Sequence, residues 1–115
     1  MSTHSALGVQ MPDGSITGCY VHYDGDSMTP RIYAYVRENT TTALVVLIAQ
    51  AQAVGGIRSF HCPSAFPEAP TNTELFDDND SYVIDETNFY DDHMCTYAWY
   101  LVNYETGNIE KRSKY

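Results

Sequence analysis

Two stretches near the N-terminus carry the residues of β-strands on either side of a turn signal. Residues 6–10 are extended in character, and residues 16–23 place Tyr20 and His22 on one face by strand alternation. Between them stands Pro12-Asp13-Gly14, in which Pro fixes φ and Gly accepts a positive φ. The pattern predicts a β-hairpin.

Two helical patterns follow. Thr29-Pro30 predicts a helix start, with Thr as the cap and Pro at the first helical position. The apolar face of this helix is made of Met28, Ile32, Tyr35 and Val36, and that of the second is made of Leu44, Leu47, Ile48 and Ala51. Residues 43–48 alone would also suit a buried strand, but the Ala/Gln continuation to residue 53 favours a helix that Gly55-Gly56 ends.

The second half of the chain predicts β-structure after a long loop. Residues 62–73 contain three prolines and predict that loop. Residues 82–84 predict a short strand, residues 94–104 a central strand with two apolar faces, and residues 109–112 an edge strand after a turn at 106–108. The predicted fold class is α+β, an antiparallel β-sheet with two α-helices packed on one face, in a single domain of residues 1–115.

Charge restricts the partners. Fifteen acidic residues against six basic ones give a net charge of −9, and residues 60–109 contain no Lys or Arg. Direct binding of nucleic acid or anionic lipid is disfavoured because both use Lys and Arg. The charge instead favours a protein partner with a basic surface.

Further composition argues for an intracellular protein without a membrane segment. The longest apolar run, residues 43–49, is much shorter than the roughly 20 residues that span a bilayer. The N-terminal residues lack the pattern of a secretion signal. Three widely spaced cysteines do not form a disulfide framework, so reduced thiols in a cytoplasm are expected.

Residues 74–92 are the predicted binding surface, because eight of the fifteen acids lie there with aromatic residues among them. Aromatic anchors supply affinity while charges steer association. The predicted binding residues are Glu74, Asp77, Asp78, Asp80, Tyr82, Asp85, Glu86, Tyr90, Asp91 and Asp92. An alternative is that the aromatic residues pin an acidic loop to the core and the charge only keeps the protein soluble.

The chain also offers an alternative site at His22, Asp24 and Asp26. These residues could form an acid/base pair or half of a metal site in a small enzyme. The favoured explanation is a strand-end histidine bonded to a turn carboxylate, because no nucleophile or second ligand pair stands at a diagnostic distance. Catalytic groups are otherwise sparse, which favours a binding protein over an enzyme. The spacings around His61-Cys62, His93 and Cys95 do not match zinc motifs, and the acidic run at 77–80 does not match a calcium loop, so no metal or cofactor is predicted.

Tyrosines form two groups along the sequence. Tyrosine is common both in strands and at interfaces. If the tyrosines serve as interface residues, they predict self-association through tyrosine-rich faces. The two groups are Tyr20, Tyr23, Tyr33 and Tyr35, and Tyr97, Tyr100 and Tyr104.

Three short motifs stand in the first half of the chain, and they are Ser2-Thr3-His4-Ser5, Pro12-Asp13-Gly14 and Tyr20-Val21-His22-Tyr23-Asp24-Gly25. Through these motifs the first half of the chain resembles a family of small accessory proteins encoded by tailed bacteriophages. Asp26-Ser27 stands where that family commonly has Tyr-Pro. The resemblance implies a protein of the bacterial host cytoplasm that binds a host or defence protein, and with the acidic charge it suggests an inhibitor that covers a basic, nucleic-acid-binding surface.

Overall fold

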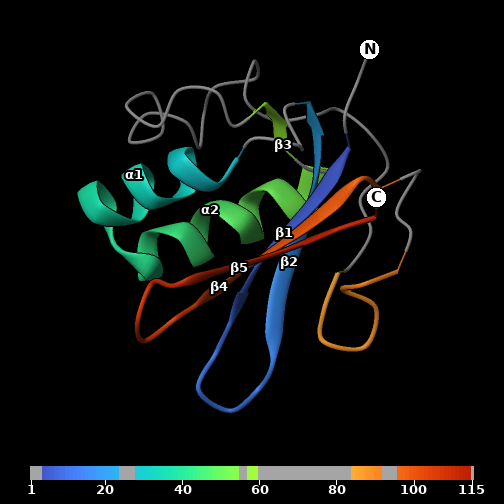
Figure 1. Cartoon of the computed structure of the whole chain (residues 1–115). Helices are drawn as coiled ribbons and strands as arrows, with labels where there is room; N and C mark the ends of the chain where they lie inside the picture. The colour runs from blue at the N-terminus through green and yellow to red at the C-terminus, as the bar shows by residue number, and fades with distance from the viewer. Residues whose placement is uncertain (1–3, 24–27, 55–56, 60–83, 92–95, 115) are drawn as a thin grey trace.

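The computed structural model describes residues 4–23, 28–54, 57–59, 84–91 and 96–114. Five strands form one sheet in the order β3-β2-β1-β4-β5, and two helices pack against it (Figure 1). The strands are β1 Ser5–Gln10, β2 Ile16–Tyr23, β3 Ile57–Ser59, β4 Ala98–Asn103 and β5 Ile109–Ser113, and the helices are α1 Thr29–Asn39 and α2 Thr41–Val54. The α+β class is confirmed.

The sheet is mixed, which corrects the expectation of a purely antiparallel sheet. The β1–β2 and β4–β5 pairs are antiparallel, while the β1–β4 and β2–β3 pairs are parallel. The antiparallel pairs are the two joined by short hairpin turns. Between β2 and β3 the two helices bring the chain back to the level of Val21, so β3 runs parallel to β2 beside the last residues of that strand.

The predicted hairpin turn is present between β1 and β2. The Gly14 N–H donates to the Met11 carbonyl at 2.9 Å, and Gly14 has a φ of +91°. Asp13 closes the turn with its carboxylate, which accepts hydrogen bonds from the Ser15 N–H at 3.0 Å and the Ser15 hydroxyl at 2.7 Å. These two bonds lower the pKa of Asp13.

The two helices meet at Thr40. The Thr40 N–H donates to the Val36 carbonyl at 2.9 Å and ends α1, and the Thr40 hydroxyl accepts from the Ala43 N–H at 3.2 Å and caps α2. The predicted cap at Thr29 is wrong: Met28 holds the cap position of α1, without a side-chain hydrogen bond, and Pro30 lies in the first turn. The helical reading of residues 43–53 is confirmed by α2.

Apolar side chains cover both faces of the sheet. The first face, which the helices cover, contains Leu7, Val9, Cys19, Val21, Ala98, Tyr100 and Val102, packed against Met28, Ile32, Tyr35, Leu44, Leu47, Ile48, Ala51 and Ile57. The second face contains Ala6, Ile16, Tyr20, Trp99 and Leu101, packed with Ile84 and Phe89. Because both faces are covered, β1 is buried from Ser5 to Val9.

Two strand predictions need refinement, and one strand was not predicted. β4 has neighbours on both sides, as its two apolar faces predict, but it begins at Ala98 rather than at residue 94. The three-residue β3 was not predicted, because it is too short to show a period. Of the predicted strand at 82–84 only Ile84 is described, and it forms an isolated bridge with Gly18. The predicted loop at 62–73 lies outside the described residues.

Candidate protein-binding face

Residues 84–91 form a segment that lies against the second face of the sheet (Figure 1). Two fully buried side chains, Ile84 and Phe89, hold it there. They pack onto Gly8 and Gly18, which are cross-strand partners in β1 and β2. A Cβ atom added to Gly8 would lie 2.6 Å from the Phe89 ring, and one added to Gly18 would lie 2.8 Å from Ile84 Cγ2. Because Gly8 and Gly18 have no side chains, the Phe89 and Ile84 side chains can pack directly against the backbone of β1 and β2.

A side chain from the helix layer also holds the segment. The Gln52 amide of α2 donates to the Gly18 carbonyl at 2.7 Å and to the Ile84 carbonyl at 3.1 Å. The Gly18 N–H donates to the same Ile84 carbonyl at 3.0 Å. Ile84 thus forms an isolated antiparallel bridge with Gly18 of β2, and Gln52 ties this position to α2.

Two of the predicted acidic residues support the local structure. Asp85 accepts hydrogen bonds from the N–H and the hydroxyl of Thr87, and these bonds lower the pKa of Asp85. Glu86 accepts from the Ile16 N–H at 3.4 Å. Both side chains lie at the surface or near it, so they contribute negative charge while they shape the segment.

Tyr90 and Asp91 end the described part of the segment. The Arg112 guanidinium of β5 lies 3.9 Å above the Tyr90 ring, a cation–π contact, and Tyr90 also packs at 6.4 Å from Trp99. The Trp99 indole N–H donates to the Asp91 carbonyl at 3.1 Å. Burial raises the pKa of Tyr90, the Glu110 carboxylate raises it further, and Arg112 opposes both. Tyr90 remains 36% exposed and offers an aromatic ring beside an acidic side chain.

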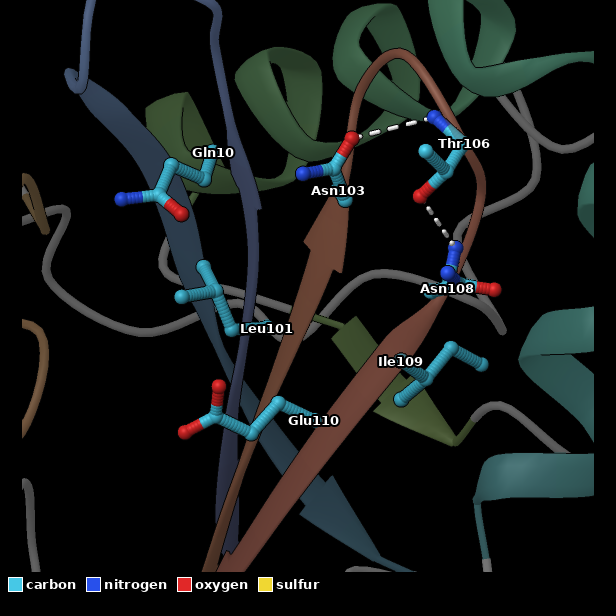
Figure 2. A pocket seen from close by; sticks show the side chains of 7 residues that line it. All are labelled: Gln10, Leu101, Asn103, Thr106, Asn108, Ile109 and Glu110. Atoms are coloured by element: carbon cyan, nitrogen blue, oxygen red, sulfur yellow. Dashed lines mark hydrogen bonds between the residues drawn. The ribbon is translucent and has the colours of Figure 1, made fainter.

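A shallow depression of about 280 Å³ lies at the end of the sheet where β1, β4 and β5 meet (Figure 2). It is lined by Gln10, Leu101, Asn103, Thr106, Asn108, Ile109 and Glu110. Polar side chains dominate this lining, and Glu110 is its one ionisable residue.

The structure places four of the ten predicted binding residues, and it brings them together. Asp85, Glu86, Tyr90 and Asp91 lie within one segment on the second face. The other six lie outside the described residues, and they are Glu74, Asp77, Asp78, Asp80, Tyr82 and Asp92.

The alternative site is not assembled in the described part of the chain. His22 lies in β2, and Asp24 and Asp26 lie outside the described residues, so this site stays a prediction. His61, Cys62, His93 and Cys95 also lie outside them. Among the residues that are described, no three His, Cys, Asp or Glu side chains gather closely enough to hold a metal ion.

The cysteine and tyrosine side chains that the structure places are largely in the core. Cys19 is a free thiol on the helix-covered face, and burial raises its pKa. Tyr20, Tyr35 and Tyr100 are buried, whereas Tyr33 on α1 is 44% exposed. Self-association through tyrosines stays a prediction. The buried rings of Tyr20, Tyr35 and Tyr100 are not available for such a contact.

Sequence reasoning missed the partners that β1, β4 and β5 bring to this face. Arg112 and Glu110 were not singled out, nor were Gln10 and Asn103. Strand alternation could have placed Trp99, Leu101 and Asn103 on one face, but the neighbours of β4 cannot be read from its own sequence.

In the described ranges no helix is both long and apolar enough to cross a membrane. No protein-family model, curated protein or solved structure matches the chain.

Proposed function

We propose that the protein binds a basic surface of another protein through the second face of its sheet, using residues 84–91 together with the acidic stretch around them. One observation carries the proposal most strongly. The buried Ile84 and Phe89 side chains pack residues 84–91 against the second face of the sheet, while Tyr90 and Asp91 remain at the surface. A fixed aromatic ring beside carboxylates is an arrangement that supports both affinity and electrostatic steering.

The charge of the whole chain supports the same choice of partner. A net charge of −9, with no Lys or Arg in residues 60–109, favours association with a basic protein over association with nucleic acid. Within the described ranges, the basic side chain that contacts Tyr90 is Arg112, and its guanidinium is engaged by that ring. The surface therefore has carboxylates in excess of its own cations.

The resemblance to phage accessory proteins supports a more specific form of the proposal. The partner is a host or defence protein in the bacterial cytoplasm, and binding covers a surface that this partner uses for nucleic acid. On this account the protein is an inhibitor that acts by occupancy, and it carries out no catalysis.

A capture experiment with matched variants tests the proposal. Tagged protein is incubated with nuclease-treated bacterial lysate, and the retained proteins are identified and then tested for competition with duplex DNA. The variant Tyr90→Ala/Asp91→Asn removes one exposed ring and one acid from the candidate face. The control Tyr33→Ala/Glu38→Gln removes the same pair of groups from α1, where both residues are exposed.

We expect a basic protein that the wild type and the α1 control retain equally, that the Tyr90/Asp91 variant retains poorly, and that duplex DNA displaces. Equal retention by both variants would contradict the proposed face. Tight, salt-sensitive binding of the purified protein to duplex DNA would contradict the proposed class of partner.

A further inference from the structure

Strand register brings four side chains of the second face into one small group. Gln10 of β1 is the cross-strand partner of Asn103 in β4, and Leu101 of β4 is the cross-strand partner of Glu110 in β5. Leu101 and Asn103 are two residues apart on one strand, so they point to the same face. In Figure 2 the Leu101 side chain lies between the Gln10 amide and the Glu110 carboxylate, in the depression described above.

The hairpin between β4 and β5 fixes one side of this depression. The Asn103 side-chain oxygen accepts hydrogen bonds from the Glu105 N–H at 2.9 Å and the Thr106 N–H at 3.0 Å. The Asn108 N–H donates to the Thr106 hydroxyl at 3.2 Å, and Gly107 turns the chain with a φ of +75°. The rim is therefore held by the turn itself and does not need a ligand to form.

Two acceptor groups in the depression are left open. In the part of the chain that the structure describes, the Gln10 amide and the Glu110 carboxylate take part in no hydrogen bond or ion pair. The nearby cations have other contacts: Arg112 lies over Tyr90, and the Lys111 ammonium lies 5.5 Å from the Tyr100 ring centroid, toward the helix-covered face. A carboxylate above an apolar floor, with an amide oxygen across from it, is suited to a cation that carries several N–H donors.

We propose that this depression receives the guanidinium group of an arginine side chain from the basic partner. A guanidinium can bond a carboxylate with two parallel N–H donors and is weakly hydrated, whereas a lysine ammonium is a compact, strongly hydrated charge. The aliphatic stem of the arginine packs on Leu101. The inference rests on the proposed function only for the source of the arginine, since the depression and its open acceptors belong to this chain.

Binding of a single arginine derivative tests the depression without any partner. Amide resonances of isotope-labelled protein are followed by NMR during titration with N-acetyl-arginine-methylamide, and then with the matching lysine and citrulline compounds. Citrulline keeps the shape of arginine and lacks its charge. Glu110→Gln removes the carboxylate, and Glu105→Gln is the matched control, because Glu105 is exposed in the same hairpin and does not line the depression.

We expect saturable shifts centred on Gln10, Leu101, Asn103 and Glu110, and an affinity about tenfold weaker in Glu110→Gln but unchanged in Glu105→Gln. The lysine compound binds more weakly, and the citrulline compound does not bind. Shifts that are absent or spread over the whole acidic surface, equal binding of citrulline, or equal effects of the two Gln variants would overturn the inference. If a basic protein is captured but Glu110→Gln binds it as well as Glu105→Gln does, this inference fails while the proposed function stands. If the arginine compound binds as expected and no basic protein is captured, this inference stands while the proposed function fails.

Discussion

The Phe89 ring lies against the backbone of Gly8 so closely that a Cβ atom at Gly8 would come within 2.6 Å of it. The contact joins the candidate binding segment to the central strand of the sheet. It explains why a strand that is buried on both faces tolerates a glycine, although glycine weakens strands elsewhere. The position of Tyr90 and Asp91 at the surface depends on this contact, because Phe89 immediately precedes them.

Gly8→Ala is expected to displace residues 84–91. The added methyl group meets the Phe89 ring and the Ile16 side chain, so we expect a loss of about 1–3 kcal/mol in the free energy of unfolding, as for other overpacked cores. Trp99 is the single tryptophan and its indole contacts the segment, so its fluorescence should shift to the red. Denaturant titration followed by fluorescence measures both effects.

The double variant Gly8→Ala/Phe89→Ala is the control for that assignment. With the ring removed, the methyl group has space, and the Gly8→Ala change should cost much less than it does in the wild type. An equal cost in both backgrounds would mean that the Phe89 contact is not the reason for the glycine.

Gln52→Glu is expected to loosen the same segment from the other side of the sheet. The substitution keeps the size of the side chain but replaces the amide donor with a carboxylate that faces the Gly18 and Ile84 carbonyls. We expect a loss of about 1–3 kcal/mol of stability, because the Gly18 carbonyl loses its side-chain donor and the Ile84 carbonyl keeps only the Gly18 N–H. Hydrogen exchange at Gly18, whose N–H bonds to Ile84, should become faster than exchange in α1. Unchanged protection of Gly18 in this variant would argue against Gln52 as a tie between the layers.

Cys19 predicts how stability depends on alkaline pH. Burial raises the pKa of its thiol in the folded protein, whereas an unfolded cysteine loses its proton near pH 8.5. Above that pH the unfolded state binds fewer protons than the folded state, so the contribution of Cys19 to stability falls by about 1.4 kcal/mol for each pH unit. Below pH 8.5 this contribution does not change with pH.

Cys19→Ala provides the comparison. Unfolding free energies of the variant and the wild type are measured at pH 7 and at pH 10, and the wild type should lose more stability between the two. The other cysteines are common to both proteins and cancel in the difference. Equal losses of unfolding free energy in the variant and the wild type would show that the Cys19 thiol ionises without unfolding.

Local patterns predicted the local structure well. The Pro12-Asp13-Gly14 turn and the apolar face of α2 follow from neighbouring residues, so they could be read directly from the sequence. The parallel β2–β3 and β1–β4 pairs could not, because the partner of a strand is set by contacts between segments that are far apart in the sequence. The functions of Gly8 and Gly18 also depend on Phe89 and Ile84, which lie far away in sequence.

The candidate site also has a part that the local sequence indicated and a part that only strand pairing brings together. The acidic and aromatic composition of residues 74–92 indicated a binding segment, and its described part lies on one face of the sheet. Arg112 reaches Tyr90 only because β5 pairs with β4, and Glu110 meets Leu101 for the same reason. Such neighbours require the sheet order, which the pattern of single strands does not contain.

The most direct test of the account is the association rate of the captured basic partner, measured across salt concentrations for two matched triple variants. Asp77→Asn/Asp78→Asn/Asp80→Asn removes three charges from the acidic segment, residues 74–92, and Asp24→Asn/Asp26→Asn/Glu38→Gln removes three charges that lie outside this segment in the sequence. We expect both proteins to fold, and we expect the first variant alone to associate slowly with a flattened salt dependence, because its charges steer the encounter. Equal association rates and equal salt dependence for the two folded variants would contradict the claim that the acidic segment is the binding surface.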